Sequence, residues 1–150
     1  MKSRTKARSI ALQVLYEADI CGHSPGTILT AKFHRLKIDD SIKYFISDIV
    51  SGVIKNITLL DEFIKDFAPD WPLDQVAIID RNLLRIALWE IAIFQKTPIK
   101  VVVNEAVELA KIYGSEGTPR FINGVLGGVI DNLQEIKLSL EIDKDNEFPD

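Results

Sequence analysis

LLRIALWEIAIF, residues 83–94, is apolar on nearly every side when it is placed on a helix. Only Arg85 and Glu90 carry a charge within it. A helix that is apolar all round belongs at the centre of a protein, where other helices cover each of its faces. The stretch therefore predicts a central helix, in which Glu90 finds a cation on another helix and Arg85 can stack on Trp89, four residues further on.

The segments around this stretch have the three- and four-residue apolar spacing of amphipathic helices. Six further helices are expected, at about residues 7–21, 27–36, 40–57, 59–67, 99–113 and 118–133. Residues 99–103, IKVVV, could form a strand if taken alone, but the sequence offers no second strand for it to pair with. The fold class predicted is all-α, a compact bundle of about seven helices.

Pro69 and Pro72 interrupt the chain near its middle. We expect one helical domain over residues 1–140, arranged as two small antiparallel subbundles at about 1–70 and 73–140. Residues 141–150, EIDKDNEFPD, contain five acidic residues and one lysine. Such a segment cannot bury itself, so we expect it to be a disordered acidic tail.

Positive charge is concentrated at the start of the chain. Lys2, Arg4, Lys6 and Arg8 fall in the first eight residues, whereas the remaining 14 basic residues face 22 acidic ones. A basic pole on an otherwise acidic chain indicates an anionic partner, and clustered Lys and Arg attract phosphates by releasing counterions. The pole therefore favours nucleic-acid binding, although a solvated terminus of this composition is also an ordinary feature.

Several other classes of function find no support. Cys21 is the only cysteine, so no disulfide within the chain is expected. Cys21 and the two histidines do not have the spacing of metal ligands, so no metal site is expected either. No apolar run reaches the ~18–20 residues of a membrane span, and the basic start is not followed by a signal-peptide pattern. No catalytic motif is present. We expect a cytoplasmic protein that is not an enzyme and has no cofactor.

Two other features are candidates for binding. Arg120 and Phe121 follow a glycine-containing loop at the start of a helix. Phe121 could stack there on an unpaired base, or it could anchor the core. Leu12 and Tyr16 fall on the side of the first helix that faces away from its apolar stripe, so they form an exposed patch or a contact within the chain or with a partner.

Several segments of the sequence resemble the NusB family of transcription antitermination factors. They are Ala7–Tyr16 (ARSIALQVLY), Leu84–Ile91 (LRIALWEI), Asn104–Lys111 (NEAVELAK), Tyr113-Gly114 and Arg120–Leu126 (RFINGVL). The resemblance extends to about Leu133. Gly117 departs from it, because some relatives have an acid just before this last segment.

The resemblance implies an all-helical fold and a function. The family binds the boxA element of single-stranded nascent RNA together with the ribosomal protein NusE, as part of the RNA polymerase antitermination complex, and so aids read-through in ribosomal RNA operons. It also implies site residues. Those for RNA binding are Lys2, Arg4, Lys6, Arg8, Arg120 and Phe121, and those for binding the partner are Tyr16 and Asp80. Both monomers and homodimers occur in the family, so a homodimer is possible.

Two alternatives remain. One is a helical adaptor that binds only proteins, with the basic start as a solvated terminus. The other is an RNA-binding module like that of the ribosomal RNA cytosine methyltransferases, which precedes a long α/β catalytic domain.

Overall fold

The computed structural model describes residues 2–147, and side chains up to residue 141. All regular structure in this part of the chain is helical, as the sequence predicts. The elements are α1 (Ser3–Cys21), α2 (Pro25–Arg35), α3 (Asp40–Lys55), α4 (Ile57–Phe67), the 3-10 turn η1 (Leu73–Gln75), α5 (Ile78–Leu88), the π-helical η2 (Trp89–Phe94), α6 (Ile99–Tyr113), α7 (Thr118–Asp131) and α8 (Leu133–Glu147).

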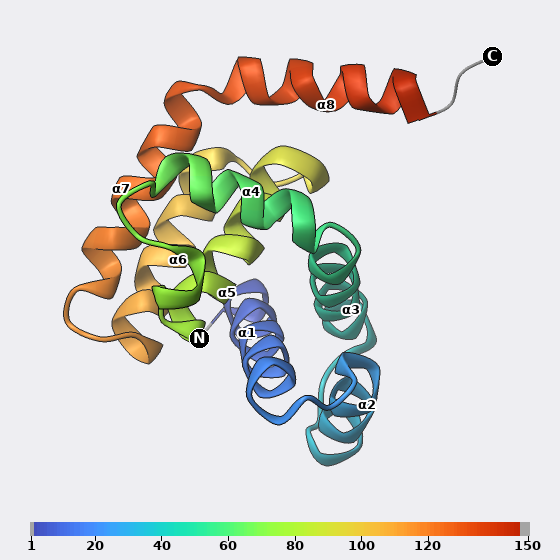
Figure 1. Cartoon of the computed structure of the whole chain (residues 1–150). Helices are drawn as coiled ribbons and strands as arrows, with labels where there is room; N and C mark the ends of the chain where they lie inside the picture. Colours follow the sequence, from blue (N-terminus) through green and yellow to red (C-terminus); the bar gives the residue numbers. More distant parts are fainter. Residues whose placement is uncertain (1, 148–150) are drawn as a thin grey trace.

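The centre of the molecule is α5 with its continuation η2 (Figure 1). Every residue from 82 to 92 is buried, which confirms the prediction of a central helix. α1, α4, α6 and α7 all pack against α5. The helix ends at Gln95, whose φ of 58° lies in the left-handed region, and the Gln95 N–H donates to the carbonyl oxygen of Glu90 at 2.9 Å.

Residues 2–147 contain eight α-helices, whereas about seven were predicted. Asn132 interrupts the chain after α7 with φ −115° and ψ 17°, and its side-chain amide donates to the carbonyl oxygen of Gly128 at 2.9 Å. α8 then leaves in a new direction along one edge of the molecule (Figure 1). Part of the predicted acidic tail, up to Glu147, belongs to α8, whereas residues 148–150 lie outside the described residues. Disorder of the tail stays a prediction.

The predicted division into two subbundles near residue 72 also stays a prediction. One continuous cluster of buried side chains extends from α1 to Ile136 on α8. α4, which precedes the predicted division, packs on α5 and α7, which follow it. Within residues 2–147, no helix has both the length and the apolar character that crossing a membrane requires.

Candidate nucleic-acid and partner interface

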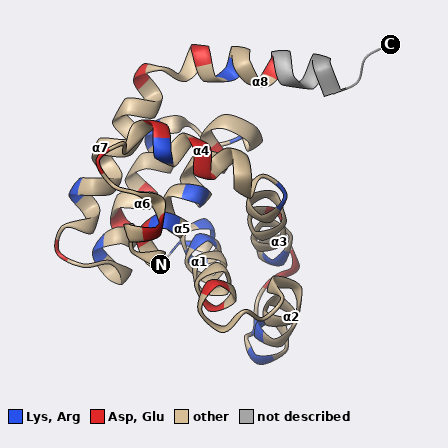
Figure 2. Ribbon diagram, in the orientation of Figure 1, with Lys and Arg blue, Asp and Glu red and all other residues tan. Residues whose placement is uncertain are grey.

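The basic start of the chain forms the first turns of α1. Lys2, Arg4 and Lys6 are exposed there. The Arg4 guanidinium lies over the ring of Phe45 on α3, with its carbon 4.3 Å from the ring centroid. Figure 2 shows Lys and Arg gathered where α1 begins, whereas Asp and Glu are spread over several other helices. We call the exposed residues Lys2, Arg4 and Lys6 the basic head.

Arg8 has a different environment from the basic head. Its side chain is 3% exposed and forms a two-pronged ion pair with Glu90, which is 1% exposed. Arg8 Nε donates to Glu90 Oε2 at 2.7 Å and Arg8 Nη2 to Oε1 at 2.9 Å. The prediction that Glu90 meets a cation from another helix is thus confirmed. The predicted RNA contact of Arg8 is not supported by this placement, because the guanidinium has no free surface for a phosphate.

A further cation, Lys96, is connected to Arg4 of the basic head through two aromatic side chains, Phe45 and Phe94. Phe45 lies 6.0 Å from Phe94 between ring centroids, and the Lys96 ammonium lies 5.1 Å from the Phe94 ring. Arg4 and Lys96 therefore flank the same aromatic pair, on which cation–π attraction can hold them. Lys96 could not be predicted from the sequence, because its contact depends on the packing of α3 against η2.

Arg120 and Phe121 lie in the first turn of α7. Arg120 is exposed, whereas Phe121 is partly buried and meets Trp71 edge to face, with ring centroids 6.5 Å apart. Trp71 is itself 56% exposed, so an aromatic surface is present beside Arg120. Phe121 packs on the core as well, so the structure leaves both of its predicted roles open.

The basic head and Arg120 lie toward opposite ends of the continuous helix formed by α5 and η2. Arg8 meets Glu90 in η2, whereas Asp80 near the start of α5 accepts a hydrogen bond from Thr118, which begins α7. Ten residues of helix correspond to about 15 Å at 1.5 Å per residue. A single nucleotide would not contact both regions, so an RNA strand would have to span them.

The two predicted partner residues lie together. Tyr16, which is 37% exposed, and Asp80 line the same surface hollow of about 280 Å³, beside Tyr113 and Ser115. They come from α1 and α5, 64 positions apart in the chain. Leu12 is fully buried, so it makes the contact within the chain that was one of the alternatives for this pair, whereas Tyr16 keeps exposed surface.

Asp80 connects this hollow to the loop before α7. Thr118 Oγ1 donates to Asp80 Oδ1 at 2.9 Å and accepts from the Ser115 N–H at 2.9 Å. Burial raises the pKa of the Asp80 carboxyl above its ordinary value of 3.8, and the Thr118 hydrogen bond opposes this effect only in part.

Asp80→Asn is expected to stabilise the protein at neutral pH. Folding raises the pKa of Asp80, so the folded protein loses stability as the pH rises through that pKa, because the folded environment disfavours the ionised carboxylate. Asparagine can still accept the Thr118 hydrogen bond but does not ionise. The midpoint of thermal unfolding should exceed that of the parent protein at pH 7, and the difference should vanish below pH 3.8. Asp74→Asn, at an exposed position, is the charge-matched control; a difference independent of pH would contradict the prediction.

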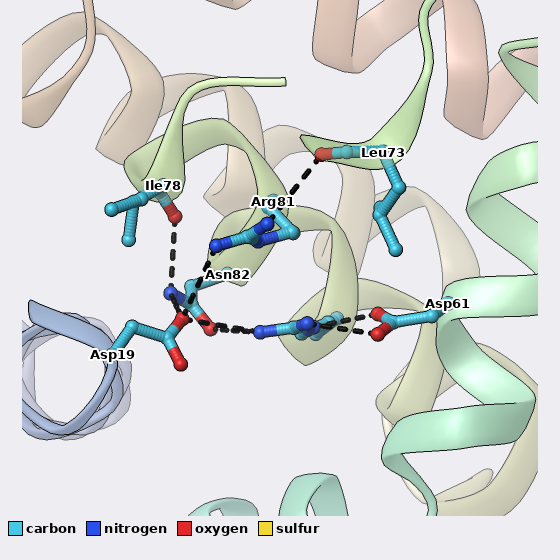
Figure 3. A network of polar contacts seen from close by, with 7 residues as sticks. Asp19, Asp61, Leu73, Ile78, Arg81 and Asn82 are labelled. Atoms are coloured by element: carbon cyan, nitrogen blue, oxygen red, sulfur yellow. Dashed lines mark hydrogen bonds and ion pairs between the residues drawn. The ribbon is translucent and has the colours of Figure 1, made fainter. Parts of the chain in front are cut away.

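A second polar network lies between α1, α4 and α5 (Figure 3). Arg85 forms a two-pronged pair with Asp61, at 2.7 and 2.9 Å, and also contacts Asp19 at 3.2 Å. The predicted stacking of Arg85 on Trp89 is therefore wrong; Trp89 stacks on Phe94, with ring centroids 4.7 Å apart. Because these groups bind one another, the network joins three helices. The described residues contain no cluster of His, Cys, Asp and Glu that could hold a metal ion.

Comparison with known proteins gives consistent matches. The NusB family model matches residues 5–131. The transcription antitermination protein NusB of Roseiflexus sp. (strain RS-1) is 41% identical over 134 residues, which cover 88% of this chain and 94% of that protein.

Two solved structures have the same fold. T. maritima NusB has a TM-score of 0.77 at 28% identity, covering 84% of this chain and 89% of that one. A crystal structure of the antitermination factors NusB and NusE in complex with dsRNA has a TM-score of 0.76 at 27% identity, covering 86% of this chain and 96% of that one.

Proposed function

The chain belongs to the NusB family, and on that basis we propose that it is a transcription antitermination factor that binds boxA-type RNA together with NusE. The observation that carries the proposal is the exposed basic head on an otherwise acidic chain. The basic head can bind phosphates, whereas the net negative charge of the rest of the chain repels them.

We propose that the RNA runs from the basic head toward Arg120 and Phe121. Lys2, Arg4 and Lys6 would bind backbone phosphates, and the exposed aromatic surface of Phe121 and Trp71 would support a base. Arg8 would act indirectly, because its pair with Glu90 fixes the turn of α1 that carries the head. In this proposal residues 1–140 act as one RNA-binding domain in the cytoplasm.

The test is binding of a fluorescent, single-stranded boxA RNA to the protein with and without NusE. The expected result is weak binding by the chain alone and tighter binding when NusE is present. A double-stranded RNA serves as a second probe, because the NusB–NusE crystal structure contains dsRNA. Binding of NusE with no binding of either RNA would instead favour a helical adaptor that recognises only proteins.

We further propose that Tyr16 and Asp80 lie in the NusE-binding surface, since both line one exposed hollow. Tyr16→Ala is expected to weaken NusE binding at least about tenfold, because a tyrosine at the centre of an interface often contributes more than 1.4 kcal/mol. Calorimetric titration with NusE measures the loss. Tyr44→Ala is the matched control, since Tyr44 lies on α3 and is 74% exposed. Equal losses in both variants would remove Tyr16 from the surface.

A further inference from the structure

A larger hollow of about 560 Å³ adjoins the one that Asp80 lines. Its walls come from α1, α2, the start of α5 and the end of α6, and Tyr16, Ile79 and Tyr113 line both hollows. The two therefore form one groove. Most of the larger hollow is apolar, with Leu12 and Ile20 on its α1 side.

One cation lies buried in this groove. Lys32 on α2 lines it and is only 9% exposed. Its ammonium donates to Gln13 Oε1 at 3.4 Å, a long hydrogen bond. Gln13 in turn donates to the hydroxyl of Tyr113 at 3.1 Å, so the amide that faces Lys32 is held in place. Among the described residues, no carboxylate lies within 4.0 Å of the Lys32 ammonium.

This arrangement is costly for the isolated chain. An ammonium group has three donors, and burying it without a counter-charge is unfavourable. A neutral amide at 3.4 Å offsets only part of that cost. One donor of the Lys32 ammonium is used by Gln13, and its other donors are available to a group that enters the groove.

We infer that Lys32 receives an acidic side chain of the protein partner, inserted into the groove beside Tyr16. The inference rests on the proposed function and deepens it. A protein segment fits better than RNA for two reasons. The walls suit apolar side chains next to the carboxylate, and Glu17, which lines the same hollow, would repel a chain of phosphates more strongly than the single charge of one carboxylate. The groove also lies on the part of α1 beyond Leu12, away from the basic head.

Lys32→Met tests the inference by calorimetric titration with NusE in the absence of RNA. The expected result is a loss of NusE affinity of about tenfold or more, since the partner's carboxylate would then be buried without its cation. The same variant should keep or raise the midpoint of thermal unfolding, because it removes a buried charge with no counter-charge. Lys37→Met, which removes an exposed lysine shortly after α2, is the control for net charge.

A second arm identifies the acid. Each acidic residue of NusE is changed in turn to its amide, and one such NusE variant should bind the parent protein and Lys32→Met with equal affinity. Lys32→Gln provides a polar alternative if Lys32→Met fails to fold. Unchanged NusE affinity in the lysine variants, or unfolding of both, would overturn the inference while the parent protein still binds NusE. Failure of the parent protein to bind NusE would overturn the proposed function as well.

Discussion

Arg8→Ala is expected to lower the free energy of unfolding by about 3–5 kcal/mol, the usual effect of removing one partner from a buried ion pair. The substitution would leave Glu90, which is 1% exposed, as a buried carboxylate without its two hydrogen bonds from Arg8. Thr97 Oγ1, which donates to Glu90 Oε1 at 3.2 Å, cannot replace a charged partner. Urea unfolding followed by circular dichroism measures the loss.

The control for this prediction is Arg4→Ala. Arg4 lies four residues earlier on α1 but is exposed, so its removal should cost no more than about 1 kcal/mol from its contact with Phe45. A double variant, Arg8→Met with Glu90→Met, should recover part of the stability, because it leaves no fully buried unpaired charge and only the partly exposed Glu105 loses its 3.8 Å contact with Arg8. Similar losses for Arg4→Ala and Arg8→Ala would contradict the assignment of Arg8 to the fold.

The burial of Arg8 could not be predicted from the sequence. The four basic residues of the first eight look equivalent, because a charge count does not say which side chain faces inward. Burial of Arg8 depends on Glu90, 82 residues away, and on the packing of α1 against α5. The sequence predicted that Glu90 needs a cation, but not which of the basic residues supplies it.

The central helix was predictable for a simple reason. A helix that is apolar on all sides is stable only at the centre of the molecule. The central location of residues 83–94, with other helices packed around them, could therefore be predicted. By contrast, α8 was missed, since a single asparagine at position 132 separates it from α7. For Leu12 and Tyr16 the sequence left open an exposed patch or a contact, and the helices packed around α1 bury Leu12 fully, whereas Tyr16 is 37% exposed.

The candidate site was partly predictable in the same sense. Tyr16 and Asp80 became candidates through family resemblance, and the structure brings them to one hollow. Lys32 gave no signal in the sequence, because a lysine on a short helix with little apolar character is ordinarily exposed. Its burial follows from the packing of α2 on α1, and only the structure contains that information.

Removing the basic head is expected to weaken RNA binding and change its dependence on salt. Lys2→Ala, Arg4→Ala and Lys6→Ala together should reduce the slope of log affinity against log salt by about 2, since each phosphate contact on single-stranded RNA contributes about 0.7. These side chains are exposed, so the thermal midpoint should change little. Binding of boxA RNA, measured in the presence of NusE across a salt series, gives the slope.

Net charge must be separated from position. A second triple variant, with alanine at Lys37, Lys55 and Lys65, removes the same charge from exposed sites outside α1. If the basic head binds phosphates directly, the slope should fall only in the first variant, because the number of counterions released depends on the number of phosphate contacts and not on the total charge of the protein. A slope that fell equally in both variants would assign the effect to the overall field of the protein, and the basic head would then attract RNA without holding it.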